Sequence, residues 1–190
     1  VTVLEQGQQI GGCLQCFSRY GAKYETGMHF IGSVVPGQTL RKLMNYLELT
    51  ADVPLSFLDQ SGYDVVALQG EQFRFANGRE PFIETMSSYF PRQRDALARY
   101  FDLVSRVAGA SSLHSLKYAE SDAAINTEFQ LRAINDVLDE LFDDELLKRV
   151  LVGNLPLYAA EQDKTPFSTH AFIMDFYNQS AARVVGGSDS

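Results

Sequence analysis

The sequence predicts an α+β fold, and three observations support that class. Short runs of β-forming residues, separated by glycine-containing turns, fill roughly the first 80 residues. Apolar residues at helical spacing dominate the remainder. Strand-like segments come mainly before the helices rather than alternating with them, which favours a segregated α+β arrangement over a parallel α/β sheet.

The first half is predicted to be mostly extended. Val1, Val3 and Leu4 alternate with a polar residue and predict a buried strand that ends at Glu5. Residues 17–31 predict an extended pair that turns at "YGAK", and residues 36–49 predict a helix behind a Pro-Gly start. Three extended runs separated by turn residues then predict an antiparallel meander, over 54–60, 63–69 and 71–77.

The second half is predicted to be helical. Amphipathic patterns cover 79–90 and 91–110, with Pro91 suited to the first turn of the second helix. From Thr127 to Phe142, apolar residues fall on one stripe, and Asp143 or Asp144 can cap a further helix that stops at Gly153. Thr165-Pro166 predicts a last helix, with the proline in its first turn.

Charge is distributed unevenly along the chain. The formal net charge of −8 argues against a nucleic-acid partner, which would require a basic face. Residues 119–149 alone carry nine acidic and three basic side chains, on a helical pattern that predicts a solvated face. No apolar run approaches the roughly 20 residues of a membrane helix. Two cysteines do not form a secreted disulfide framework, so a cytoplasmic location is expected.

The cysteines and histidines are the first candidates for chemistry. Cys13 and Cys16 form a Cys-x-x-Cys that thiol redox chemistry or a metal could use, but no βαβ unit precedes it and no second cysteine pair follows it. We therefore predict no metal site. His29, in a glycine-rich extended segment, and His170, in an aromatic-rich helix, are candidates for catalysis, although histidines in such settings are more often packed core or rim residues.

A second candidate site combines an acid with a pair of glycines. A carboxylate at the end of a strand, such as Glu5, can accept hydrogen bonds from the ribose of a dinucleotide. Gly11 and Gly12 would let the backbone approach a cofactor closely, because they carry no Cβ. The glycine-rich turn that precedes such an acid in a dinucleotide-binding unit is absent from the sequence.

Two stretches near opposite ends of the sequence match the motifs of one family. Residues 24–32, "YETGMHFIG", match that family's aromatic-acid-x-Gly-x-His-aromatic-x-Gly pattern behind its Gly-Gly-Cys. Near the other end, Pro166-Phe167, His170, Tyr177 and Gly186-Gly187-Ser188 resemble its Pro-aromatic, His, Tyr and Gly-Gly-Ser region. In these motifs the chain resembles FAD-dependent oxidoreductases of the phytoene desaturase, carotenoid isomerase and retinol saturase type. The resemblance implies a flavoenzyme that acts on carbon–carbon double bonds of an apolar isoprenoid or retinoid-like substrate.

The resemblance also implies roles for particular residues. Glu5 would bind the adenosine ribose of FAD, and Gly11 and Gly12 would pass close to the cofactor. Gly27, Met28 and His29 would lie near the isoalloxazine ring. The junction of flavin and substrate would include His170, Tyr177, Gly186 and Gly187. His29, His170 and Tyr177 are then the candidates for catalysis.

The family's Gly-x-Gly-x-x-Gly turn and closing FAD-binding segment are missing, so the chain is expected to be an interior fragment. Residues 1–35 would be a remnant of the FAD-binding domain, 36–180 a substrate-side α+β domain, and 181–190 the start of the return segment. We expect the longer parent protein to bind FAD and to contact membranes peripherally. The isolated chain is expected to lack tight FAD binding and activity, and to dimerise or displace its first strand.

Two other interpretations remain open at this point. An amine oxidase-like flavoenzyme shares the acid and the Gly-Gly arrangement, but typically has arginine where this chain has Cys13. A non-enzymatic α+β interaction domain with an acidic helical face would make the glycines ordinary turn residues.

Overall fold

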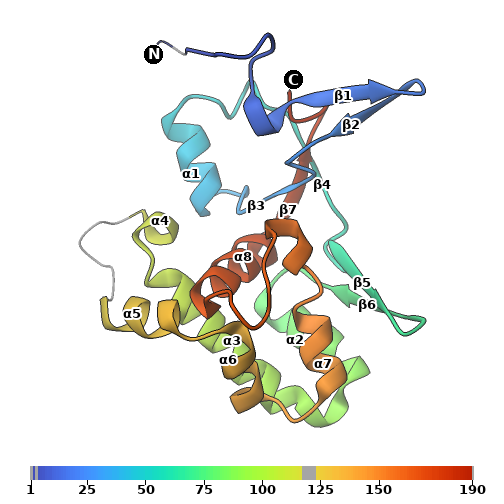
Figure 1. Ribbon diagram of the computed structural model, residues 1–190, viewed down its shortest axis with the longest axis vertical. Coiled ribbons are helices and arrows are strands. Elements are labelled where there is room, and N and C mark those ends of the chain that lie inside the picture. Colours follow the sequence, from blue (N-terminus) through green and yellow to red (C-terminus); the bar gives the residue numbers. More distant parts are fainter. Residues whose placement is uncertain (1, 3, 117–122, 190) are drawn as a thin grey trace. The chain divides into compact units, whose positions relative to one another are not determined.

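The computed structural model describes residues 2, 4–116 and 123–189 (Figure 1). Its helices and small antiparallel sheets confirm the predicted α+β class. The described residues form two compact units. The first unit combines the residues up to Leu58 with those from Ala181 onward, and the second runs from Asp59 to Ser180. The predicted division at residue 35 into cofactor-side and substrate-side domains concerns function and stays a prediction.

The first unit contains a tight hairpin. Strand β1 (Cys16–Arg19) pairs antiparallel with β2 (Ala22–Glu25), and Arg19 lies opposite Ala22. The two connecting residues, Tyr20 and Gly21, have φ angles of 52° and 78°. Positive φ at both positions is the geometry of a type I′ turn, whose twist matches that of the paired strands. The predicted extended pair turning at "YGAK" is confirmed.

The predicted strand at the start of the chain is not formed by its described residues. Leu4 and Glu5 have irregular backbone, Leu4 is 93% exposed, and Val1 and Val3 lie outside the described residues. A strand needs a neighbouring strand for its backbone groups, and the described part of the chain supplies none here. The Glu5 carboxylate instead accepts a 2.6 Å hydrogen bond from the Gly7 amide.

The remainder of the first unit is organised by its last strand. Strand β7 (Ala181–Val184) lies between β3 (Ile31–Gly32) and β4 (Leu55–Phe57), and both pairings are antiparallel. Helix α1 (Thr39–Tyr46) connects these two outer strands in sequence and confirms the predicted helix. Residues from both ends of the described chain are therefore joined in one small sheet.

The second unit begins with a hairpin and continues as helices. Strands β5 (Asp64–Leu68) and β6 (Glu71–Phe75) pair around Gln69 and Gly70. The predicted three-stranded meander is wrong in one respect, because β4 pairs with β7 instead of β5. The helical elements that follow are α2 (Arg79–Tyr89), η2 (Pro91–Gln93), α3 (Arg94–Gly109), α4 (Ser112–Ser115), α5 (Ala123–Leu131), α6 (Ile134–Leu141), α7 (Glu145–Leu151), η4 (Leu155–Tyr158) and α8 (Phe167–Gln179).

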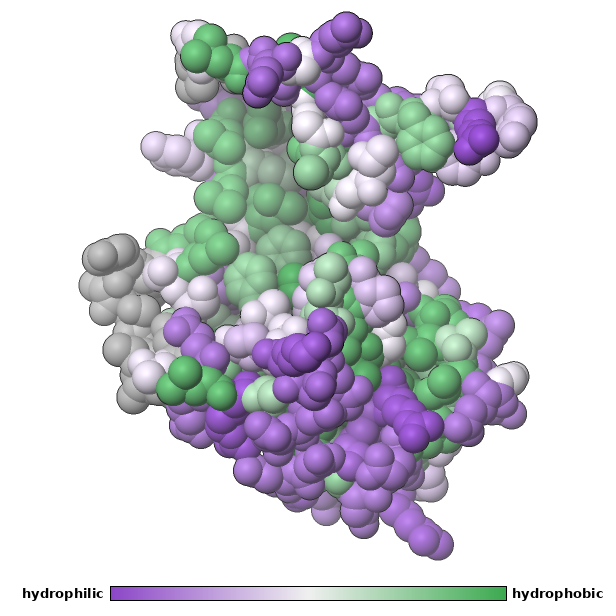
Figure 2. Space-filling view, viewed as in Figure 1, coloured by the Kyte–Doolittle hydropathy of each residue, from purple (hydrophilic) through white to green (hydrophobic). Residues whose placement is uncertain are grey.

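The core of the second unit is built around α3 and α8, which pack along each other. Helix α2 covers β6, and the Phe75 ring of the strand packs edge-to-face against the Phe82 ring of the helix in the interior. The largest fully buried side chains in this unit are Phe75, Phe82, Ile83, Met86, Leu97, Tyr100, Ile134, Leu138, Leu147, Leu151, Phe167 and Met174. Figure 2 shows hydrophilic residues over α6, as expected for a solvated acidic face.

The predicted stripe from Thr127 to Phe142 is divided between two helices, α5 and α6. The chain is extended at Ala133, which forms an isolated bridge with Pro166. The Phe167 amide donates to the Arg132 carbonyl at 2.9 Å, and the Ile134 amide donates to the Thr165 carbonyl at 3.1 Å. The same bridge places Pro166 just before the last helix rather than in its first turn. None of the described helices is long and apolar enough to cross a membrane.

Candidate functional site

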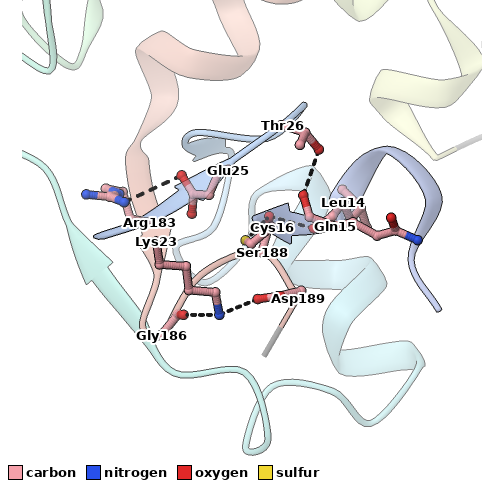
Figure 3. A network of polar contacts seen from close by, with 10 residues as sticks. All are labelled: Leu14, Gln15, Cys16, Lys23, Glu25, Thr26, Arg183, Gly186, Ser188 and Asp189. Carbon is pink, nitrogen blue, oxygen red and sulfur yellow. Dashed lines mark hydrogen bonds and ion pairs between the residues drawn. The ribbon is translucent and has the colours of Figure 1, made fainter. Parts of the chain in front are cut away.

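The candidate site lies in the first unit, where residues 11–29 meet the segment after β7. Figure 3 shows the polar contacts that join them, from the hairpin, the turn before it and residues 186–189. All of the predicted cofactor-binding positions except Glu5 lie on these segments, namely Gly11, Gly12, Gly27, Met28, His29, Gly186 and Gly187. The structure therefore brings into one unit glycines that are about 170 residues apart in sequence.

Gly27 is packed directly against the turn that contains the first cysteine. A Cβ added at Gly27 would lie 2.5 Å from the Cys13 carbonyl oxygen, which is closer than real Cβ atoms approach. The Thr26 hydroxyl donates to the Gln15 carbonyl at 2.6 Å and lies 3.1 Å from the Cys13 carbonyl. These contacts fix the end of the hairpin beside the Gly-Gly turn.

Gly11 and Gly12 form an open part of the backbone. Their φ angles are 117° and 52°, and Gly12 begins a short 3₁₀ turn, η1 (Gly12–Leu14). No atom lies within 4 Å of the position that a Gly12 Cβ would occupy. Another molecule can therefore approach this backbone closely, which is the property that a glycine provides at a cofactor site.

The Gly-Gly-Ser segment near the end of the chain is held against the hairpin. Gly187 has a φ of 112°, and a Cβ there would lie 3.2 Å from both Cys16 Sγ and Lys23 Nζ. The Ser188 hydroxyl donates to the Leu14 carbonyl at 2.7 Å. The Lys23 ammonium donates to the Gly186 carbonyl at 2.8 Å. Residues 186–188 therefore pack against one face of the hairpin.

Ion pairs complete this junction. Lys23 Nζ lies 2.5 Å from Asp189, and this hydrogen bond raises the pKa of Lys23 and lowers that of Asp189. Glu25 is 8% exposed, and its carboxylate lies 3.4 Å from Arg183 and 3.9 Å from the His29 ring. A cavity of about 400 Å³ is lined by Lys23 and Glu25 together with Ser56 and residues 183–187.

The two cysteines are reduced and differ in exposure. Cys13 is exposed, whereas Cys16 is half-buried, with its sulfur 3.4 Å from the Ser188 hydroxyl. Within residues 2, 4–116 and 123–189, no three His, Cys, Asp or Glu side chains gather in a way that could hold a metal ion. Cys16 is therefore placed as a packing residue of the junction, and Cys13 lies at its surface.

His170 and Tyr177 lie in the second unit, apart from the residues of this junction in sequence. His170 is fully buried, and both of its ring nitrogens are hydrogen-bonded: Nε2 lies 2.8 Å from the Tyr100 hydroxyl and Nδ1 lies 3.1 Å from the Tyr158 hydroxyl. Burial lowers the pKa of His170 to about 4, so the ring is neutral near pH 7. Tyr177 is half-buried, and burial raises its pKa. Their predicted roles stay predictions.

The remaining predicted positions differ in exposure. The His29 side chain is 57% exposed and Met28 is half-buried. Glu5 is exposed and bonded to its own loop, and its role toward a ribose stays a prediction.

Sequence reasoning missed the charged residues of the junction. Lys23 and Glu25 alternate on one strand, so once the "YG" turn fixes the register they share a face of the hairpin. That signal was present in the sequence. The partners of these residues, Asp189 and Arg183, lie more than 150 residues away, and no local pattern identifies them.

Comparisons with known proteins identify relatives of the chain. It is 29% identical to all-trans-retinol 13,14-reductase of Rattus norvegicus over 95% of the chain and 32% of that protein. It is 27% identical to the Homo sapiens protein of the same name, over 99% of the chain and 33% of the relative. A Danio rerio protein of that name is 25% identical over 98% of the chain. The chain thus spans about a third of the length of these relatives.

A protein-family model gives the broader assignment. The model described as "Flavin containing amine oxidoreductase" matches residues 1–181, which is nearly the whole chain. That description names a flavin as the family's cofactor, in agreement with the glycine-lined junction found here. The chain belongs to the flavin-containing amine oxidoreductase family.

Proposed function

We propose that the chain is part of an FAD-dependent oxidoreductase that acts on carbon–carbon double bonds of an apolar isoprenoid or retinoid-like substrate. The junction of Gly27, Gly187 and the Gly-Gly turn is the observation that carries this proposal. Family membership supports the flavin, and the relatives named all-trans-retinol 13,14-reductase support the substrate class.

The residues present fit a flavin dinucleotide in two respects. The open backbone at Gly12 permits close approach by a planar or extended cofactor. The nearby cavity contains the cationic side chains of Lys23 and Arg183 beside the Glu25 carboxylate. These cations suit a ligand whose phosphates replace their present carboxylate partners, Asp189 and Glu25. When bound, FAD supplies the hydride-transfer chemistry. The residues of this chain bind the cofactor, orient it and shield it from water.

Individual roles follow from this proposal. Glu5 binds the adenosine ribose, and Gly11 and Gly12 pass beside the cofactor. Gly27, Met28 and His29 face the isoalloxazine ring, with Gly186 and Gly187 supporting them from the returning chain. His170 and Tyr177 belong to the substrate side.

We extend the proposal to the partners and location of the protein. The substrate is an apolar small molecule, and a cytoplasmic protein with peripheral membrane contact could reach it. The isolated 190-residue chain binds FAD weakly, because its sequence holds no Gly-x-Gly-x-x-Gly turn of the kind that binds the pyrophosphate in related flavoproteins. It forms a homodimer or displaces its first strand, because that strand has no partner strand among the described residues.

Flavin content tests the proposal. The longer parent protein is purified with Gly187→Val, and flavin is measured by visible absorbance against protein concentration. We expect the variant to lose most of its flavin, because the branched side chain would enter the space of Cys16 and Lys23. Gly109→Val is the matched control, since no atom lies within 4 Å of its added Cβ and its φ is not positive. A colourless unsubstituted protein would overturn the assignment.

An amine substrate is a second candidate, favoured by the description of the matching family. The two candidates are separated by supplying the flavin-loaded protein with all-trans-retinol or with a set of primary amines. Reduction of the flavin by an amine, with no change in the flavin's absorbance spectrum when the retinoid is added, would favour the second candidate.

A further inference from the structure

A groove in the second unit has chemistry unlike that of the other described cavities. It has a volume of about 270 Å³ and lies among the end of α3, the start of α4, α5 and the first half of α8. Its apolar walls are Val107, Leu113, Phe172 and Ile173, and none of the described side chains that line it is charged.

Two other cavities among the described residues are strongly charged. One of about 820 Å³ is lined by Arg92, Arg99 and several acidic residues of α6 and the loop after it. The cavity of about 400 Å³ at the glycine junction contains Lys23, Glu25 and Arg183. A ligand that avoids charge therefore finds a matching surface in the groove between α3 and α8.

The helical pattern of α8 explains the groove. Phe172 and Ile173 follow Thr169 by three and four residues, so the three side chains share one side of the helix. Ala171 and Met174 point to the other side and are fully buried in the core. The groove face of α8 is thus apolar without being needed for the core, and Phe172 and Ile173 remain half-buried.

Polar groups in the groove are neutral hydrogen-bonding side chains. Ser111 and Thr169 contribute hydroxyls, and Gln130 contributes an amide. Behind the apolar wall, the His114 ring packs edge-on against Phe172, with ring centroids 5.4 Å apart, and pairs with Asp175 at 2.8 Å. The His114 and Asp175 side chains support the wall from behind and do not line the groove.

We propose that this groove binds the apolar part of a neutral isoprenoid alcohol, with its hydroxyl directed to the hydroxyls of Ser111 and Thr169. Ligand sites are typically mostly apolar with a few well-placed polar groups, which is the composition found here. The volume lies near the small end of such sites, so the groove holds a ring or a short chain segment. That the groove binds such an alcohol is inferred from its lining. That the alcohol is the enzyme's substrate rests on the proposed function.

Titration of the 190-residue chain with all-trans-retinol, followed by retinol fluorescence and without any flavin, tests the groove directly. Ser111→Phe fills the groove from a half-exposed position and is expected to weaken binding by about tenfold or more. Ser88→Phe makes the same change at an exposed site on α2 and is expected to leave binding unchanged. Circular dichroism confirms that both variants are folded.

Two further measurements examine the polar end. Thr169→Val keeps the shape but removes the hydroxyl, and should weaken retinol binding severalfold. Retinoic acid should bind more weakly than retinol, because none of the described residues that line the groove is a cation that could pair with its carboxylate. Saturable binding that Ser111→Phe leaves intact, or the absence of saturable binding, would overturn the proposal. Flavin loss in the Gly187→Val parent reports on the proposed function independently.

Discussion

At the scale of single residues, the glycines of the junction are needed for two different reasons. Gly12 has a positive φ but open space around it, so a side chain there meets only backbone strain. Gly27 has no positive φ, and its requirement is steric, because the Cys13 carbonyl occupies the place of a side chain. A comparison of the two positions separates conformational from packing constraints.

Alanine substitutions at these positions should therefore differ in cost. Gly27→Ala forces the hairpin end away from the Cys13 carbonyl, and we expect it to lower the stability of the first unit by about 2–3 kcal/mol. Gly12→Ala costs about 1 kcal/mol, the cost of a left-handed conformation. Denaturant-dependent hydrogen exchange of peptides covering 13–27 measures both. Equal losses would show that the 2.5 Å approach at Gly27 is not a real constraint.

His170 makes the stability of the second unit depend on pH. Its folded pKa of about 4 lies below the ordinary value of 6.5, so the unfolded chain binds a proton first as pH falls. Stability contributed by the neutral, buried ring is complete above pH 6.5 and is lost as pH drops toward 4. The loss amounts to about 3 kcal/mol, at 1.36 kcal/mol for each pH unit between the two values.

Urea unfolding at several pH values between 4 and 7.5 measures this contribution. His170→Phe removes the titrating group, so its stability should change less with pH over that range than that of the unsubstituted chain. The comparison is necessary because paired carboxylates, such as Asp175 beside His114, also lose stabilisation in acid. Parallel pH profiles for the two proteins would mean that His170 is not buried neutral.

At the scale of elements, local sequence signals account for most of the helices and both hairpins. The short helix α7 is an example, because Asp144 caps it through 3.0 Å hydrogen bonds from the Leu146 and Leu147 amides to one carboxylate oxygen. Both Asp143 and Asp144 were predicted as possible caps. The structure selects Asp144, whereas Asp143 accepts a hydrogen bond from Gln93.

Asp144→Ala should destabilise the second unit by about 1 kcal/mol, since it leaves two amides of the first turn without their acceptor. Asp143→Ala is the adjacent control and should cost less, because its exposed contact with Gln93 replaces hydrogen bonds to water. Thermal unfolding of the two variants gives the comparison. A larger loss from Asp143→Ala would transfer the capping role to that residue.

Elements whose form depends on distant residues could not be predicted. The stripe from Thr127 to Phe142 has continuous helical periodicity, yet Ala133 is extended because Pro166, 33 positions away, pairs with it. Strand β4 has turn signals that suit a meander, but its partner is β7, more than 120 residues later. In the candidate site, the glycine positions followed from the family resemblance, whereas the ion pair of Lys23 with Asp189 required the fold.

At the scale of the whole molecule, the first unit is assembled from two distant parts of the chain. Its three-stranded sheet has β7 at the centre, so β3 and β4 both pair with a strand that follows the entire second unit. Backbone hydrogen bonds from Leu58 to Ala181 and from Val185 to Pro54 extend this pairing on either side. The second unit, by contrast, is continuous from Asp59 to Ser180 and has its own aromatic core.

Removal of residues 181–190 should therefore affect the two units unequally. The truncated chain loses the central strand of the sheet and the contacts of Gly186, Ser188 and Asp189 with the hairpin. Hydrogen exchange should show loss of protection at Ile31–Gly32 and Leu55–Phe57, because without β7 their amides have no hydrogen-bond acceptor in a neighbouring strand. The amides of α3 and α8 should stay protected. Arg183→Ala, at an exposed position of β7, is the control that preserves the strand and should retain protection in both units. Persistent protection of β4 without β7, or simultaneous loss in α3 and α8, would contradict the division of the chain into a unit closed by its last strand and a unit that is stable by itself.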